Sequence, residues 1–186
     1  MFKLLSQVVS GVKGGIVSTL EGTADVTGSI VGAVRDLTVN TVKESGEFIK
    51  QGFNVPASVV KGSLDGISEI GSSVVGAIKG VVHGTVHGFM QEGGKQNDAV
   101  QGAVGQAIKS AEELGQNVGD AAVASVHGAV DAVKDIGGDT TEALKDAVTA
   151  AFNTAKDIGG NAIDDVEDAL KAGVDGADKI IDSIKK

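Results

Sequence analysis

The chain is 186 residues long, with 25 acidic and 16 basic side chains, 28 glycines, one proline and no Cys, Trp or Tyr. Apolar residues make up 41% of it but aromatic residues only 3%. It is therefore too apolar for a solvated tail and too poor in bulky side chains for a compact aromatic core. The lack of cysteine excludes a disulfide framework and a zinc–thiolate site, and acidity without a basic face argues against nucleic acid as a partner. We expect a cytoplasmic protein.

A 22-residue repeat runs along the chain. Residues 132–138 (AVKDIGG) return as residues 154–160 (TAKDIGG), and glycines recur at positions 71, 93, 115, 137 and 159. Apolar residues recur in steps of 4, 4, 3, 3, 4 and 4, so six contacts span one repeat, which is the period of an α-helix and not of a strand. The sequence predicts an all-α fold of elongated amphipathic helices, built on repeats of two 11-residue halves.

The apolar positions of the repeat form one continuous stripe, which is the predicted contact surface for lipid or for a partner. The stripe consists of Leu20, Val42, Leu64, Val86, Val104, Ile108, Val126, Val130, Leu144, Val148, Phe152, Val166, Leu170 and Val174. Each helical glycine costs about 1 kcal/mol relative to alanine, so an isolated helix of this composition is unstable in water. We expect its helicity to depend on a surface, a partner or self-packing.

Residues 1–51 form the first predicted amphipathic segment. The first apolar residues are interrupted at Ser6 and Gln7 without a small-residue cleavage site, so no signal peptide is predicted. The stripe is interrupted again around Gly52 and Pro56. Residues 52–57 are therefore the first predicted break.

Residues 58–92 form the second amphipathic segment, in which Gly76, Gly80, Gly84 and Gly88 recur every four residues. One interpretation is a glycine zipper for tight helix association, in a membrane or in an assembly. The other is a flexible, glycine-rich connector, because of the helical cost of glycine. A spanning helix is not predicted, since residues 71–90 carry a lysine and two histidines.

Residues 93–98 form the second predicted break and residues 99–186 an acidic amphipathic segment. Asp139 with Glu142 predicts a capping box, and Asn161 predicts a further helix cap. The unbroken stripe favours one continuous rod, whereas the glycine pairs favour helices of about 20 residues that kink or fold back. The local chemistry favours the second. The predicted helix breaks are Gly93, Gly94, Gly137, Gly138, Gly159 and Gly160.

No recognisable constellation for catalysis is present. His83 and His87 are four residues apart, but no neighbouring Cys, carboxylate or third His completes a metal site. The sequence contains no nucleophile elbow, zincin motif or phosphate-binding loop. We predict no enzymatic activity, no metal and no cofactor.

The 22-residue unit of two amphipathic halves resembles the repeats of exchangeable apolipoproteins, perilipin-type lipid-droplet coats and synucleins. The stretch Gly80-Val81-Val82-His83-Gly84 also resembles part of the synuclein repeat region. The resemblance implies a helix that lies in a lipid interface.

Two functional hypotheses follow. The first is a non-enzymatic protein that coats a lipid or storage-granule surface through its stripe, peripheral to a membrane or lipid body. The alternative is a self-assembling structural protein, in the form of a right-handed coiled coil, a helical bundle or a filament. The predicted partner is accordingly a lipid surface or further copies of the chain as a homo-oligomer. The valine-rich stripe and small flanking residues favour self-packing, whereas a neutral first half and an acidic second half favour a lipid anchor with a solvated outer part.

Overall fold

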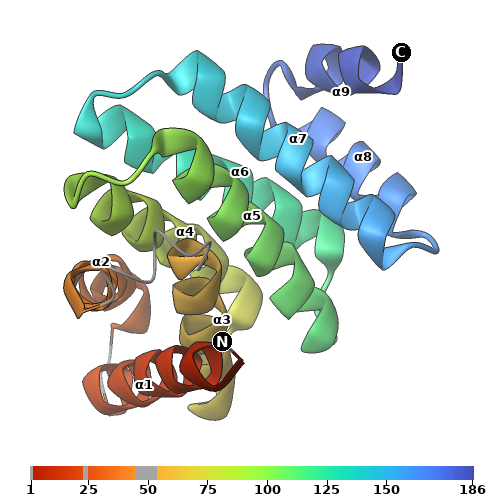
Figure 1. Cartoon of the computed structure of the whole chain (residues 1–186). Coiled ribbons are helices and arrows are strands. Elements are labelled where there is room, and N and C mark those ends of the chain that lie inside the picture. Colours follow the sequence, from red (N-terminus) through yellow and green to blue (C-terminus); the bar gives the residue numbers. More distant parts are fainter. Residues whose placement is uncertain (1, 23–24, 45–53) are drawn as a thin grey trace.

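The computed structural model of the chain describes residues 2–22, 25–44 and 54–186. These residues form nine α-helices and no strand, which confirms the all-α prediction, and they contain no aromatic cluster (Figure 1). The helices are α1 (Phe2–Leu20), α2 (Val26–Glu44), α3 (Val55–Glu69), α4 (Val74–Gln91), α5 (Gln96–Glu113), α6 (Val118–Ile136), α7 (Thr140–Ile158), α8 (Ala162–Gly173) and α9 (Ala177–Lys185).

From α4 to α8, each 22-residue repeat is one helix followed by one turn. These five helices begin 22 residues apart. The turns after α3, α4, α5 and α6 share one design: a glycine with φ between 70° and 85° donates its N–H to the carbonyl three residues back, and the next residue donates to the carbonyl five residues back. The four glycines are Gly71, Gly93, Gly115 and Gly137. Glycine recurs there because a side chain would strain a left-handed backbone.

Polar side chains begin several of the helices. The Asp139 carboxylate accepts the Glu142 N–H at 3.0 Å, at the predicted cap of α7. Asn161 lies at the N-cap of α8, as predicted, but its side chain makes no capping hydrogen bond. Four further caps escaped the sequence analysis. They are Asp25, Asn54, Ser73 and Asn117, whose side chains accept backbone N–H groups of α2, α3, α4 and α6.

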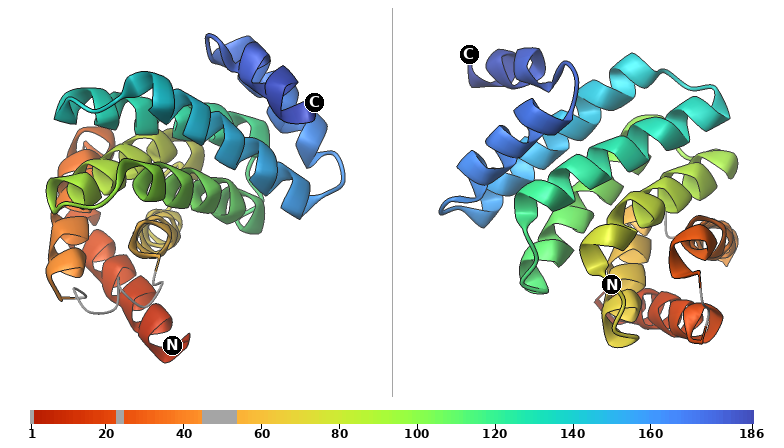
Figure 2. Two further views of the ribbon diagram at one scale, coloured as in Figure 1. Left: turned by 45° about the horizontal axis from the view of Figure 1, so that its top comes forward. Right: turned by 180° about the vertical axis from the view of Figure 1, so that it is seen from behind.

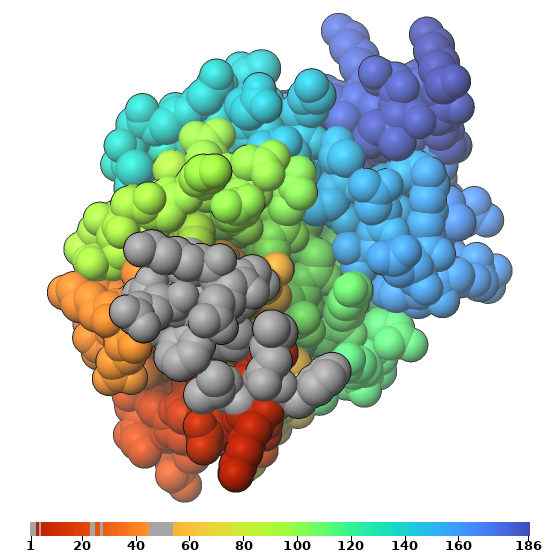
Figure 3. Space-filling model, viewed as in Figure 1, coloured from red at the N-terminus to blue at the C-terminus, as the bar shows by residue number. Residues whose placement is uncertain are grey.

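The helices form a stack of two layers. α1, α3, α5 and α7 pack side by side in one layer and α2, α4, α6 and α8 in the other, while helices that follow each other in sequence touch across the layers. α4 and α6, and likewise α5 and α7, run alongside each other in the same direction, whereas α3 crosses α1 and α5 and is seen end-on in the left view of Figure 2. The stack advances from the N-terminal helices at one end to α9 at the other, and Figure 3 shows the same order of colours on the surface.

The described residues form separate helices joined by turns, and not the single rod that the unbroken stripe allowed. Gly93 and Gly94, Gly137 and Gly138, and Gly159 and Gly160 all lie between helices. The second predicted break, at residues 93–98, is shorter than expected because α5 already begins at residue 96.

The first predicted break, at residues 52–57, falls partly outside the described residues, which resume at residue 54. Val55 and Pro56 form the start of α3. Proline fits the first turn of a helix because its missing N–H has no acceptor there. Pro56 thus begins a helix.

Candidate functional site

The stripe lies inside the stack, between the two layers. All of its residues are buried except Val42, Val130 and Leu144, which are half-buried. Phe152, the largest of them, is 1% exposed. The described part of the chain thus uses its own helices to cover most of the surface that the sequence analysis assigned to lipid or a partner.

Glycines lie where neighbouring helices of one layer approach most closely. A Cβ on Gly84 would lie 2.7 Å from the Val31 carbonyl oxygen, and one on Gly88 would lie 2.8 Å from the Arg35 carbonyl oxygen, both on α2. Gly80 meets the Ile30 side chain of the same helix. Three of the four zipper glycines therefore face α2, inside the chain.

The fourth zipper glycine, Gly76, differs. Its nearest neighbour is the Ser73 side chain, which caps α4. Gly128 on α6 repeats the close approach one step further along the even layer, against the backbone of Lys79 and His83 on α4.

Ion pairs join neighbours within a layer at a fixed spacing. Lys61 contacts Glu113 at 2.8 Å, Lys79 contacts Asp131 at 2.9 Å, and each pair is 52 residues apart. The hydrogen bond that Lys61 donates to the Glu113 carboxylate raises the pKa of Lys61. Exposed pairs of this kind add at most about 1 kcal/mol each. Their role is to fix the register between neighbouring helices of one layer.

The sequence analysis missed these pairs. A separation of 52 residues is two repeats plus eight residues, close to two further helical turns. The spacing of 52 residues can be predicted only if it is known that each helix packs against the helix two places later in the sequence.

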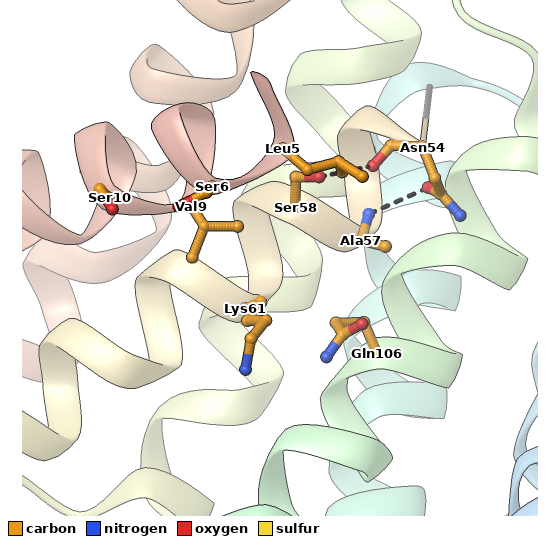
Figure 4. Close-up of a pocket in the computed structure, with 9 residues that line it drawn as sticks. All are labelled: Leu5, Ser6, Val9, Ser10, Asn54, Ala57, Ser58, Lys61 and Gln106. Atoms are coloured by element: carbon orange, nitrogen blue, oxygen red, sulfur yellow. Dashed lines mark hydrogen bonds between the residues drawn. The ribbon is translucent and has the colours of Figure 1, made fainter. Parts of the chain in front are cut away.

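A pocket of about 390 Å³ opens between α1, α3 and α5 (Figure 4). Val9 and Lys61 lie on facing sides of it, and Gln106 closes it from α5. Asn54 and Ser58 are held at its rim, since the Asn54 side chain accepts the Ala57 N–H and the Ser58 hydroxyl donates to the Asn54 carbonyl. The rest of the lining consists of Leu5, Ser6, Ser10 and Ala57.

A second pocket of about 300 Å³ continues from the first across α5 to α7 and shares Asn54 and Gln106 with it. Gly102 and Gly105 contribute no side chain to its floor, and its other polar residues are amides, one hydroxyl and one ion of each sign: Gln101, Lys109, Asn153, Thr154 and Asp157. The two pockets together form a shallow groove, which is mostly apolar beside α1 and mostly polar beside α7. Its side chains can donate and accept hydrogen bonds, but the lining of neither pocket pairs a nucleophile with a histidine base.

His83 and His87 lie on α4 beside α2 and α6. His83 Nε2 is 3.0 Å from the Asp135 carboxylate, and the two imidazole centres are 6.3 Å apart. Burial, followed by the positive charge of Arg35, lowers the pKa of His87. Within the described ranges, no group of three His, Asp or Glu side chains could hold a metal ion.

The comparisons with known proteins add no relatives. No family model matches the chain, and no curated protein matches it. Among the described helices, none combines the length and the hydropathy needed to cross a membrane.

Proposed function

We propose that the protein is a non-enzymatic structural protein, in which the stripes of successive helices pack on one another to build an elongated helical-repeat scaffold. The burial of the stripe carries this proposal. A Val- and Ala-rich seam with small flanking residues is suited to helix–helix packing. The scaffold acts through its outer faces, assembling with copies of itself or with other helical proteins in the cytoplasm.

The acidic outer surface supports a soluble scaffold. Basic side chains next to the stripe of α6, α7 and α8 are Lys134, Lys145, Lys156 and Lys171, and all four are exposed. A lipid coat gains binding energy from apolar side chains that enter the headgroup region and from basic residues against anionic lipid. Here the apolar side chains are already covered, so a lipid coat requires the stack to open first.

Far-UV circular dichroism tests the proposal. The purified chain is measured over a hundredfold concentration range, alone and with vesicles of phosphatidylcholine or of phosphatidylcholine with phosphatidylserine. We expect high helicity without lipid and no gain from either vesicle, with sedimentation velocity reporting the association state. Low helicity that rises only with vesicles would replace the scaffold by a lipid-binding coat.

A further inference from the structure

The outward face of α1 repeats a pattern that elsewhere in the chain seats a helix. Ser10, Gly14, Ser18 and Glu21 of α1 and its end correspond, 48 residues later, to Ser58, Gly62, Gly66 and Glu69 of α3 and its end. In α3 this set holds α1. A similar ridge recurs too, since Val12-Lys13 corresponds to Val60-Lys61.

The α1–α3 contact shows what the pattern does. A Cβ on Gly62 would lie 2.6 Å from the Val9 carbonyl oxygen and 2.9 Å from the Val12 Cβ, so only glycine admits the α1 ridge there. One turn later Gly66 meets Ile16. At the end of the contact, Lys13 Nζ lies 2.6 Å from the Glu69 carboxylate.

The equivalent face of α1 has no such cover among the described residues, although Ser10, at its edge, also lines the pocket between α1, α3 and α5. A Cβ on Gly14 would meet nothing within 4 Å, and Ser10, Gly14, Ser18 and Glu21 are all exposed. No ion pair of Glu21 forms with the described part of the chain. Gly11 also faces open space.

Exposed helical glycine is costly, because glycine destabilises a helix by about 1 kcal/mol relative to alanine. In α3 and α4 the glycines allow close helix contacts that offset this cost. In α1, Gly11 and Gly14 have no compensating contact. The other layer ends with more polar residues. The residues of α2 that correspond to Ser10, Gly14 and Ser18, 22 positions later, are Gly32, Asp36 and Asn40, of which Asp36 and Asn40 are exposed. A polar end of that kind is what closes a repeat stack.

We propose that the outward face of α1 docks an amphipathic helix of a partner protein. The occupant carries the ridge Val-x-x-Val-Lys-x-x-Ile, as α1 does at residues 9–16, with its valines over Gly14 and its lysine against Glu21. The internal contact of α1 on α3 sets the shape of the occupant, and the uncompensated Glu21 carboxylate sets its charge. The inference rests on the proposed function, since it requires the stack to be folded.

The probe is a fluorescent peptide with the sequence of residues 2–20, titrated with the full chain and followed by anisotropy. We expect saturable binding. Gly14→Val places a branched side chain in the contact and should weaken binding about tenfold or more. Glu21→Lys should weaken it a few-fold, and the peptide with Lys13→Glu should recover that loss with the Glu21→Lys chain. Gly32→Val is the matched control: Gly32 is a helical glycine of α2 that also faces open space, and its substitution should leave binding unchanged.

Each outcome has one meaning. Loss of binding with Gly14→Val together with the charge-swap rescue supports the proposal. Binding that survives Gly14→Val would mean that the peptide displaces α1 from its contact with Gly62 on α3, and this would overturn the proposal. Self-association abolished by Gly14→Val would make the occupant a second copy, and overturns the partner helix. Absence of peptide binding overturns the inference alone if circular dichroism shows a helical, cooperatively folded chain, whereas an unfolded free chain refutes the proposed function as well.

Discussion

The two ends of the stack are built differently. At the C-terminal end, α9 lies across α7 and α8 and buries Ile181 completely. Glu167 on α8 receives Lys185 from α9 at 2.6 Å and Lys171 from its own helix at 2.7 Å. At the N-terminal end, α1 presents uncovered glycines. The comparison indicates that α9 covers the C-terminal end of the stack, whereas α1 at the N-terminal end keeps the residue pattern of an interior helix.

The closure coincides with a departure from the repeat. α8 is 12 residues long, against 18 or 19 for α4 to α7, and Gly176 with φ 84° starts α9 ahead of the 22-residue frame. A helix that leaves the frame can cross its predecessors and cover them. α1 follows the repeat, so its outward face has the residues that interior helices use to contact a neighbour. Such a face does not close the N-terminal end of the stack.

Charged substitutions in the apolar stripe, which runs through the whole stack, should have the largest effect on stability. Val104→Asp with Val148→Asp places two charges where both side chains are 0% exposed. Each unpaired buried charge costs several kcal/mol, against a total stability of about 5–15 kcal/mol. We expect loss of the helical signal and of the cooperative thermal transition in circular dichroism.

Gln101→Asp with Asn153→Asp is the control for this pair, since it adds the same charges to the same two helices at exposed positions. It should melt close to the wild type. If the buried pair stayed as helical and as stable as this control, the stripe would not form the interior.

Glycines at the covered and uncovered faces should respond with opposite signs. Gly84→Ala forces a Cβ within 2.7 Å of the Val31 carbonyl oxygen and 3.0 Å of the Arg35 nitrogen, which should cost about 1–3 kcal/mol of overpacking. Gly14→Ala meets nothing and should add about 0.5–1 kcal/mol through helix propensity. Urea unfolding of both variants measures the difference, and equal effects would remove the distinction between the two faces.

The turns should respond more weakly. Gly137 has a φ of 81° and its N–H donates to the Lys134 carbonyl at the end of α6. Gly137→Ala should cost about 1 kcal/mol, because alanine is strained in the left-handed conformation. Gly32→Ala, at an open position within α2, provides the control and should be slightly stabilising. A gain of stability at residue 137 would favour a continuous helix through that turn.

Much of the helical part of the fold is written in the spacing of the sequence. The step pattern predicts helices, the glycines at intervals of 22 mark their ends, and Asp139 with Glu142 marks a start. The same phase suits a rod and a stack, however, because a stack of identical turns returns each helix to the same orientation. The phase alone could not separate them.

The candidate surfaces were less predictable. Gly80, Gly84 and Gly88 indicate a close helix contact, but the sequence does not say that the contact is α2 of the same chain. The groove around Asn54 and Gln106 combines residues more than 50 positions apart, and no sequence motif joins them. Such sites depend on the packing of each helix against the helix two places later, and this tertiary contact is not encoded in a local sequence pattern.

The closed end should show the smallest effect, and one that depends on pH. Hydrogen bonds from Lys171 and then Lys185 lower the pKa of Glu167 below its ordinary 4.5. A carboxyl whose pKa is lower in the folded state stabilises that state above pH 4.5, and this contribution is lost as the pH falls through the folded pKa. Glu167 is largely buried but both lysines are partly exposed to solvent, so Glu167→Gln should cost about 1 kcal/mol at neutral pH, and the difference from the wild type should vanish in acid.

Urea unfolding of both chains from pH 7 to pH 3 tests this assignment, with Asp178→Asn as a control for the loss of one exposed carboxylate from α9. A Glu167→Gln penalty that persists unchanged at pH 3 would mean that shape and not charge holds α9 in place. In that event closure of the C-terminal end would rest on apolar residues of α9 such as Ala177 and Ile181, and the contrast with the open face of α1 would be one of apolar packing.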